Sequence, residues 1–215
     1  MRVLLAGGSG MIGSALRAWL GSEGHEVRML LRSDAAPNGY SWLGRPGSVP
    51  EAAVDWADAI VSLNGASLSH LPWTKSYRES IRCSRVDATQ GLAQAIAESA
   101  DPPLVWVSGS AVGYYGDATG EAELVESSPA GTSFLAQVVN EWERATEPAE
   151  LRTRVVNIRT GLVMARSGAL APLALATRFG AGARIGRGSQ WWPWISLEDE
   201  VRAIAFALEE ASLRG

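Results

Sequence analysis

With 215 residues, 47% of them hydrophobic and 20% charged, the chain can bury one sizeable core and has no apolar stretch long enough to span a bilayer. Its net charge of −4 includes no block of like charges, so neither nucleic acid nor an anionic membrane surface is indicated as a partner. One cysteine and two histidines exclude a disulfide framework and leave no metal-ligand spacing. We therefore expect a single cytoplasmic domain over residues 1–215 whose partner is a small molecule, with a homodimer as an open alternative.

The first thirty residues predict a strand, a loop, a helix and a second strand. A short apolar run covers residues 2–6, and apolar residues then recur at helical spacing from Ile12 to Leu20. Gly24-His25 turns the chain into a second apolar run over residues 26–31. Together these segments make a βαβ unit.

The next segment changes in composition. Residues 34–50 are rich in Pro, Gly, Asn and Ser, which predicts mostly loop, with Tyr40 and Trp42 as the candidates for a short third strand. The apolar run over residues 58–63 predicts a fourth strand that ends in turn residues.

Helices and strands continue to alternate in the second half of the chain. A helix over residues 84–100 ends before a fifth strand over 104–108, and apolar residues from Leu135 to Trp142 predict the next helix. Residues 155–158 predict a sixth strand, and Ser196 caps a last amphipathic helix. This alternation predicts an α/β fold of the Rossmann type, a doubly wound parallel sheet with helices on both faces.

A glycine-rich loop separates the first strand from the first helix. A dinucleotide pyrophosphate must approach backbone N–H groups at a helix N-terminus, and a Cβ at Gly7 or Gly10 would intrude on it. Gly13 would let the helix pack close against the first strand. The alternative is a plain glycine turn. We favour dinucleotide binding, with the candidate contacts Gly7, Ser9, Gly10, Met11, Ile12 and Gly13.

The residue after the second strand bears on the choice of cofactor. Sites that prefer NAD place an acidic residue there to hold the ribose 2′-hydroxyl. This chain has Arg32, whose guanidinium suits a 2′-phosphate. We therefore predict NADP(H), against the alternative of an exposed arginine at a strand end.

Tryptophan is abundant, with nine residues in the chain. Trp191, Trp192 and Trp194 are nearly contiguous, which predicts a packed corner or the wall of a ligand pocket. Trp191 is the candidate substrate contact. A partner surface is the less favoured interpretation.

Several motifs occur in order and together resemble one family. The chain is similar to the atypical extended short-chain dehydrogenases/reductases known as nucleoside-diphosphate-sugar epimerase-like, or YfcH-type, proteins. The resemblance covers essentially the whole chain and rests on Gly7 to Gly13, Ser62-Leu63-Asn64-Gly65-Ala66, Trp73-Thr74, Ser84-Arg85-Val86, Ser108-Gly109-Ser110-Ala111-Val112-Gly113-Tyr114-Tyr115-Gly116, Arg159-Thr160-Gly161 and Gly186-Arg187-Gly188-Ser189-Gln190-Trp191.

The resemblance implies roles for residues at two strand ends. Leu63, Asn64 and Gly65 would pass beneath the adenosine ribose and phosphates, unless they only end a strand in a turn. Ser108 would meet the nicotinamide. Ser110 matches the catalytic serine of extended members, whose hydroxyl bonds a substrate oxygen, although it could instead satisfy the loop backbone.

The chain departs from the superfamily pattern where active members carry Tyr and Lys four residues apart on one helix face. Phe134 and Val138 stand there, and neither can exchange a proton. Tyr114 or Tyr115 could replace the acid, and we name Tyr115 as the candidate, although both could be packing aromatics. Without a positioned lysine a phenol is a poor base at neutral pH.

Two arginines complete the candidates. Arg85 would hold an anionic substrate group or form a salt bridge on a solvated face, whereas Arg159 is the better candidate for a buried structural ion pair. Family members continue for several tens of residues beyond the point that matches Leu213–Gly215. The resemblance thus implies that the substrate-side lobe, to which residues 160–215 contribute, is short or missing.

These observations predict an NADP(H)-binding, epimerase- or oxidoreductase-like protein that acts on a small substrate, with nucleotide-linked molecules among the candidates. The alternative is a catalytically inactive NADP(H)-binding regulatory module, because Phe134 and Val138 replace the catalytic pair.

Overall fold

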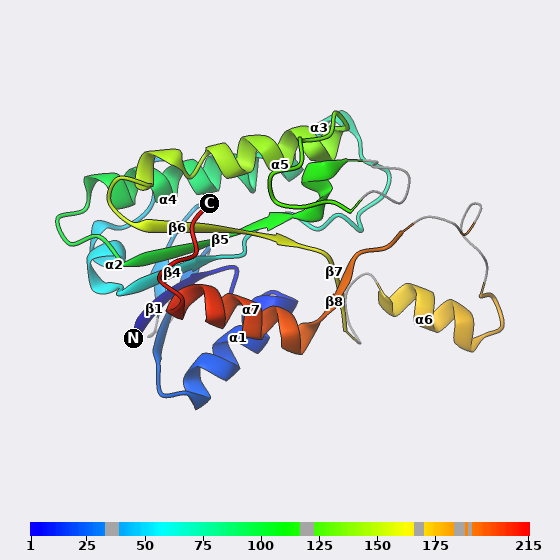
Figure 1. Cartoon of the computed structure of the whole chain (residues 1–215), viewed down its shortest axis with the longest axis horizontal. Coiled ribbons are helices and arrows are strands. Elements are labelled where there is room, and N and C mark those ends of the chain that lie inside the picture. Colours follow the sequence, from blue (N-terminus) through cyan, green and yellow to red (C-terminus); the bar gives the residue numbers. More distant parts are fainter. Residues whose placement is uncertain (33–38, 117–122, 166–169, 183–187, 189–190) are drawn as a thin grey trace.

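Within residues 1–32, 39–116, 123–165, 170–182, 188 and 191–215, which the computed structural model describes, six parallel strands form the main sheet (Figure 1). Their order is β3-β2-β1-β4-β5-β6, so the winding reverses between β1 and β4. The prediction of a Rossmann-type doubly wound sheet is confirmed. The strands are β1 (Arg2–Ala6), β2 (Glu26–Leu31), β3 (Gly39–Ser41), β4 (Ala59–Ser62), β5 (Val105–Ala111) and β6 (Arg154–Thr160).

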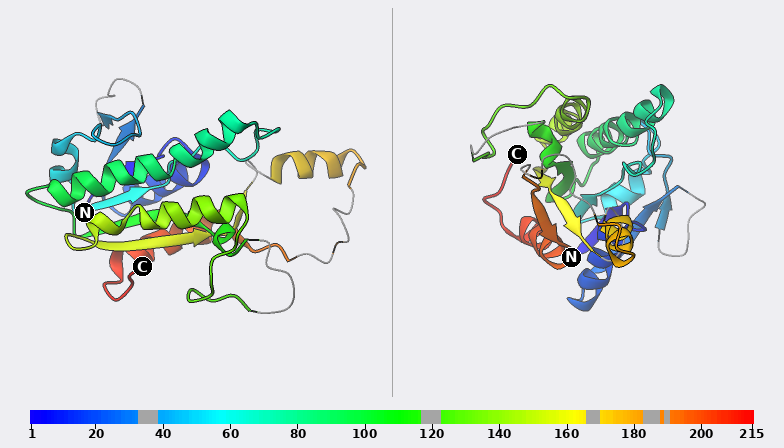
Figure 2. Two further views of the ribbon diagram at one scale, coloured as in Figure 1. Left: turned by 90° about the horizontal axis from the view of Figure 1, so that it is seen from above. Right: turned by 90° about the vertical axis from the view of Figure 1, so that its right-hand side faces the viewer.

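Helices cover both faces of this sheet (Figures 1 and 2). On one face lie α1 (Met11–Ser22) and α7 (Leu197–Glu209). The opposite face carries the remaining helices of the main body, together with the short 3-10 turns η1 (Val112–Tyr115) and η2 (Glu147–Ala149). Those helices are α2 (Glu51–Trp56), α3 (Lys75–Cys83), α4 (Val86–Glu98) and α5 (Phe134–Arg144).

The alternation of side chains along β1 divides the core into two layers. Val3 and Leu5 pack among the buried residues of α1 and α7, whereas Leu4 packs against α2 and α4. A strand buried on both faces needs apolar residues at every position, which explains why β1 is a continuous apolar run. The sheet therefore holds both helical layers at fixed positions.

The chain forms a second, smaller unit beyond β6. There β7 (Leu162–Met164) pairs in parallel with β8 (Trp194–Ser196), and α6 (Leu170–Arg178) stands clear of the main sheet (Figures 1 and 2). The expectation of a packed tryptophan corner is wrong. Trp191 is 78% exposed, Trp192 46% and Trp194 65%, because the described elements of this unit do not pack over them.

The sequence did not predict α2, α3, α6, β7 or β8. In α3 only Ile81 is buried and most other residues are polar, so no run of apolar residues marked this helix in the sequence. β3 includes Tyr40 but ends before Trp42, and residues 34–38 of the predicted loop lie outside the described residues. No helix in the described part of the chain is both long and apolar enough to cross a membrane.

The first turn of α7 buries a carboxyl group. Glu200 is 1% exposed, and the Thr160 hydroxyl donates a hydrogen bond of 2.6 Å to its Oε1. Burial raises the pKa of Glu200 above its ordinary value, because the charged form loses its solvation.

We expect Glu200→Gln to unfold at a higher temperature than the wild type at neutral pH. The folded wild type favours the protonated form, so its stability falls as the pH rises through the ordinary carboxyl range, and the uncharged variant escapes this loss. Thermal unfolding at several pH values measures the gain, which should shrink in acid. Glu209→Gln, at an exposed position of the same helix, is the matched control. A gain independent of pH would contradict the prediction.

Candidate functional site

A cleft of about 560 Å³ opens at the carboxyl ends of β1, β2 and β4. This is the switch point at which doubly wound sheets bind ligands. Several predicted site residues line it, and so do residues that the sequence did not single out for the site, among them Leu43, Gly44 and Tyr77. The predicted residues in its wall are Gly7, Ser9, Gly10, Arg32, Leu63, Asn64 and Gly65.

The glycine loop is held against the loop after β4. Gly7 has a φ of +78°, and a Cβ there would lie 2.7 Å from the carbonyl carbon of Leu63. A Cβ on Gly13 would overlap the Gly7 carbonyl oxygen, so Gly13 allows α1 to approach the loop itself and not β1 as predicted. At Gly10 a Cβ would be tight, 3.3 Å from the same oxygen. The strictest requirement for glycine thus falls on Gly7 and Gly13.

The N-terminus of α1 lies at the floor of this cleft. Gly10 is its N-cap residue, no side chain of the described residues caps it, and its first turn, which includes Met11 and Ile12, carries no acidic residue. The first N–H groups of a helix have no partner within the helix, and the helix dipole makes this end positive. The position therefore suits a phosphate.

The opposite wall is tied to the junction of α3 and α4. The Asn64 side-chain amide donates to the Ser84 carbonyl at 2.8 Å, and the Ser84 hydroxyl accepts from the Ala66 N–H at 2.8 Å. Asn64 thus shapes the wall through the backbone. Sequence reasoning missed Ser84, whose signal was its place in the Ser84-Arg85-Val86 motif.

Arg85 lies behind the same wall. Its guanidinium donates to the carbonyl oxygens of Ala66 at 3.2 Å and Ile81 at 3.1 Å, and a Cβ on Gly65 would be 2.9 Å from its Cζ. No carboxylate among the described residues pairs with it, and burial lowers its pKa. The alternative of a salt bridge on a solvated face is wrong, because the guanidinium is enclosed by backbone and lies 5.4 Å from the Trp142 ring.

The other end of the cleft is cationic. Arg32 follows β2, is exposed and lines the cleft. Trp42 also lines it, is 3% exposed, and has a buried indole N–H without a hydrogen-bond partner in the described residues. Trp42 was expected as part of a strand and instead helps to form the wall.

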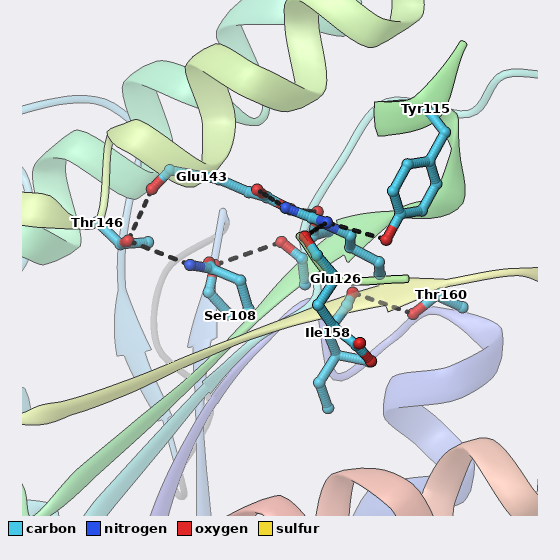
Figure 3. Close-up of polar contacts among 11 residues, drawn as sticks. Ser108, Tyr115, Glu126, Glu143, Thr146, Ile158 and Thr160 are labelled. Carbon is cyan, nitrogen blue, oxygen red and sulfur yellow. Dashed lines mark hydrogen bonds and ion pairs between the residues drawn. The ribbon is translucent and has the colours of Figure 1, made fainter. Parts of the chain in front are cut away.

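The hydroxyls of Ser110 and Tyr115, the two candidate catalytic residues, are both hydrogen-bonded to one ion pair, that of Glu143 and Arg159 (Figure 3). The Ser110 hydroxyl donates to Glu143 Oε1 at 2.5 Å. Arg159 donates to both oxygens of Glu143, at 2.8 and 2.9 Å, and to the Tyr115 hydroxyl at 2.9 Å. Figure 3 shows Glu143 reaching from α5 and Tyr115 from η1 toward the same place above β5 and β6.

This ion pair is largely enclosed, with side-chain exposures of 20% for Arg159 and 13% for Glu143. Arg159 also donates to the Glu126 carbonyl at 3.0 Å, and its Cζ lies 3.6 Å from the centroid of the Tyr114 ring. Glu143 raises the pKa of the Arg159 guanidinium. The prediction of an ion pair at Arg159 is confirmed, and its partner Glu143 gave no signal in the sequence.

Other predicted residues lie apart from the cleft. Ser108 has no exposed surface and lies 3.5 Å from the Ser62 hydroxyl inside the sheet, so its side chain cannot contact a ligand in this structure. Val138 is 3% exposed within α5, and the Phe134 ring lies beneath the Arg78 guanidinium. Trp191 is exposed and does not line the cleft.

Metal and thiol chemistry find no support in the described part of the chain. No group of three or more His, Cys, Asp or Glu residues is arranged there to hold a metal ion. Burial raises the pKa of Cys83 to about 12, so this thiol stays protonated at neutral pH.

Comparisons with known proteins point to one family. Residues 3–214 match the model of the NAD dependent epimerase/dehydratase family. The chain is 43% identical to the Mycobacterium leprae epimerase family protein ML0860, with 99% of this chain and 69% of that protein aligned.

Two solved structures share the fold over 100% of this chain. The nucleoside-diphosphate sugar epimerase from Corynebacterium glutamicum has a TM-score of 0.87 and 37% identity, and this chain spans only 45% of its length. The human epimerase family protein SDR39U1, solved with NADPH, has a TM-score of 0.89 and 35% identity over 72% of its length.

We expect Ser84→Ala to destabilise the protein by about 1 kcal/mol, because it leaves the Ala66 N–H without its acceptor in a partly buried place. Urea unfolding measures the change. The control is Ser80→Ala, one helical turn before Ser84, since the Ser80 hydroxyl bonds only a carbonyl of its own helix. Equal unfolding midpoints for the two variants would contradict the role given to Ser84.

Proposed function

The chain belongs to the NAD-dependent epimerase/dehydratase family, whose members bind a nicotinamide dinucleotide, and we propose that it binds NADP(H) in the cleft and acts on a small substrate. Nucleotide-linked molecules are candidates for that substrate. The observation that carries the proposal is the uncapped N-terminus of α1 at the floor of a cleft that Arg32 also lines. The activity proposed is that of an oxidoreductase or epimerase.

The residues of the cleft fit a dinucleotide. Gly7 and Gly13 leave room that a Cβ would fill with a clash against backbone, so the loop can bring its amides close to a phosphate. The volume of about 560 Å³ lies in the range of small-molecule sites. The buried N–H of Trp42 at the wall is one donor for which a ligand could supply an acceptor, directly or through water.

Arg32 favours NADP(H) over NAD(H). A guanidinium forms charge-assisted hydrogen bonds with a 2′-phosphate and offers nothing comparable to a free 2′-hydroxyl. The chain places no acidic residue at the end of β2, where Leu31 and Arg32 stand. The human relative crystallised with NADPH supports the same choice.

When bound, the nicotinamide would supply hydride transfer. The chain's own contribution lies at the end of β5. Ser62 at the end of β4 pairs with Ser108, so Ser110 lies level with the Leu63–Asn64 wall on the neighbouring strand. We propose that Ser110 and Tyr115 bind and orient the substrate there, and that Tyr115 exchanges the proton.

A second candidate function is a regulatory module that binds NADP(H) without turnover. Its support is that Phe134 and Val138 stand where the superfamily carries its Tyr and Lys. Val138 is buried, so a lysine placed there would have to lose its solvation, and restoring the pair is a poor test. Hydrogen exchange with and without NADPH, beside a screen of carbonyl substrates, separates the two functions: altered protection without turnover favours the module.

We expect Arg32→Gln to weaken NADPH binding by about tenfold to a hundredfold and to leave NADH binding unchanged, since hydrogen bonds to a charged group contribute about 1.5–3 kcal/mol. Isothermal titration calorimetry with both cofactors measures this. Arg202→Gln removes the same charge at an exposed position on α7 and should change neither affinity. A wild-type protein that binds NADH more tightly than NADPH would reject the assignment.

Gly7→Ala should abolish binding of both cofactors, because the Cβ would collide with the Leu63 and Asn64 backbone. Gly24→Ala is the matched control. Gly24 has a φ of +79° and no heavy atom within 4 Å of its Cβ position, so this variant carries the backbone strain, about 1–3 kcal/mol, without the collision. Calorimetry on folded protein compares them, and full binding by Gly7→Ala would contradict the loop assignment.

A further inference from the structure

The Tyr115 hydroxyl keeps its own hydrogen for another partner. Arg159 Nη1 lies 2.9 Å from the phenol oxygen, and a guanidinium has donors and no acceptor, so the oxygen must accept this bond. No acceptor among the described residues takes the phenol hydrogen. Tyr115 is therefore set to donate.

The Ser110 hydroxyl has the opposite role. It donates its one hydrogen to Glu143 Oε1 at 2.5 Å. Glu143 can take it because the carboxylate, held by two bonds from Arg159, is an acceptor. The Ser110 oxygen is left with lone pairs and can only accept a further hydrogen bond.

The fold brings both hydroxyls to one place at the carboxyl end of β5, the strand that pairs with β4. Ser110 and Arg159 are register partners across β5 and β6, and η1 follows directly after β5. Figure 3 shows Tyr115 and Glu143 converging there from opposite directions. Because Glu143 balances the charge of Arg159, the pair offers no net charge to an anionic substrate group.

We propose that Arg159 and Glu143 are positioning residues that make Tyr115 the proton donor and Ser110 the hydrogen-bond acceptor for a carbonyl compound with a neighbouring hydroxyl group. This inference deepens the proposed function and rests on it. The substrate class is an α-hydroxy ketone, the arrangement found in a keto sugar. Arg159 supplies from a strand the cation that the superfamily carries on the helix, where this chain has Val138.

The proposed step balances as a reduction. The carbonyl carbon takes a hydride from the reduced cofactor, which is thereby oxidised, and the carbon–oxygen π pair moves to the oxygen. That oxygen forms a bond to the Tyr115 proton as the phenol O–H bond breaks. Arg159 then faces a phenolate until solvent returns the proton, while Ser110 accepts a bond from the substrate hydroxyl.

The test uses the purified chain with NADPH and the probe 1,3-dihydroxyacetone. Consumption of NADPH gives kcat and KM, calorimetry gives the affinity for NADPH, and saturation-transfer NMR reports probe binding to the protein loaded with NADP⁺. Acetone serves as the carbonyl that lacks a neighbouring hydroxyl. Thermal unfolding shows that each variant is folded.

Tyr115→Phe should lower kcat by about a hundredfold, the ordinary contribution of a proton donor, with KM and NADPH affinity nearly unchanged. Tyr114→Phe is the matched control, because it keeps the ring beside Arg159 and should leave kcat unchanged. Equal rates in these two variants would overturn the role of Tyr115. Both keep their rings, so this comparison does not depend on the stability of the ion pair.

Ser110→Ala should raise KM for dihydroxyacetone by about tenfold, the loss of one hydrogen bond, and leave KM for acetone unchanged. The same variant should lose the NMR signal of bound dihydroxyacetone. An equal effect on both ketones would overturn the proposed substrate class.

Arg159→Ala should lose kcat about as strongly as Tyr115→Phe, and millimolar guanidinium chloride should restore part of it at unchanged NADPH affinity. Arg159→Lys keeps the charge without the planar fork and should fall between wild type and Arg159→Ala. If Arg159→Ala does not fold, Arg159→Lys carries the test, and wild-type kcat in that variant would overturn the positioning role. A wild type that binds NADPH but reduces neither ketone overturns this inference alone, whereas a wild type that does not bind NADPH overturns the proposed function.

Discussion

The site depends on one close backbone contact, between the loop after β1 and the loop after β4. Gly7 approaches Leu63 so closely that no side chain fits between them, and it does so in a left-handed conformation. Gly13 then brings α1 against that loop. The parallel pairing of β1 with β4 fixes both loops at the same edge of the sheet, so the helix N-terminus and the Leu63–Asn64 wall enclose one cleft.

The proposed substrate end, at the carboxyl end of β5, depends on side chains. The bidentate pair of Glu143 and Arg159 joins α5 to β6, and further bonds reach Ser110 on β5, Tyr115 on η1 and the carbonyl of Glu126. A largely enclosed charge pair stabilises a fold only when its remaining donors and acceptors are satisfied. The same bonds that satisfy Arg159 therefore also fix the hydrogen-bonding roles of the two hydroxyls.

The sequence predicts those elements and site residues that leave a pattern of apolar residues or glycines in it. The strands β1, β4 and β5 are buried on both faces and are apolar runs, so the sequence predicted them, and it predicted the glycine loop from its place between a strand and a helix. The polar helix α3 buries only Ile81, so no apolar run marked it, and Ser84 lay in a recognised motif whose role, a contact with the Ala66 backbone, the sequence did not show. The prediction for the tryptophans was wrong because aromatic content does not say whether another element covers the rings. Glu143 could not be assigned from the sequence, because its ion pair forms only when the fold brings α5 to Arg159 on β6.

The two ends of the proposed site would therefore recognise their ligands in different ways. Backbone amides and glycines cannot change their donor pattern, which suits a cofactor whose diphosphate is the same in every reaction. Hydroxyls take their donor or acceptor role from their neighbours, so the substrate end can be altered by changing the residues behind Ser110 and Tyr115 without touching either. The resemblance implies that Phe134 and Val138 stand at the positions of the helical Tyr and Lys, and in this chain the phenol of Tyr115 nevertheless lies beside a cation, Arg159, which β6 supplies.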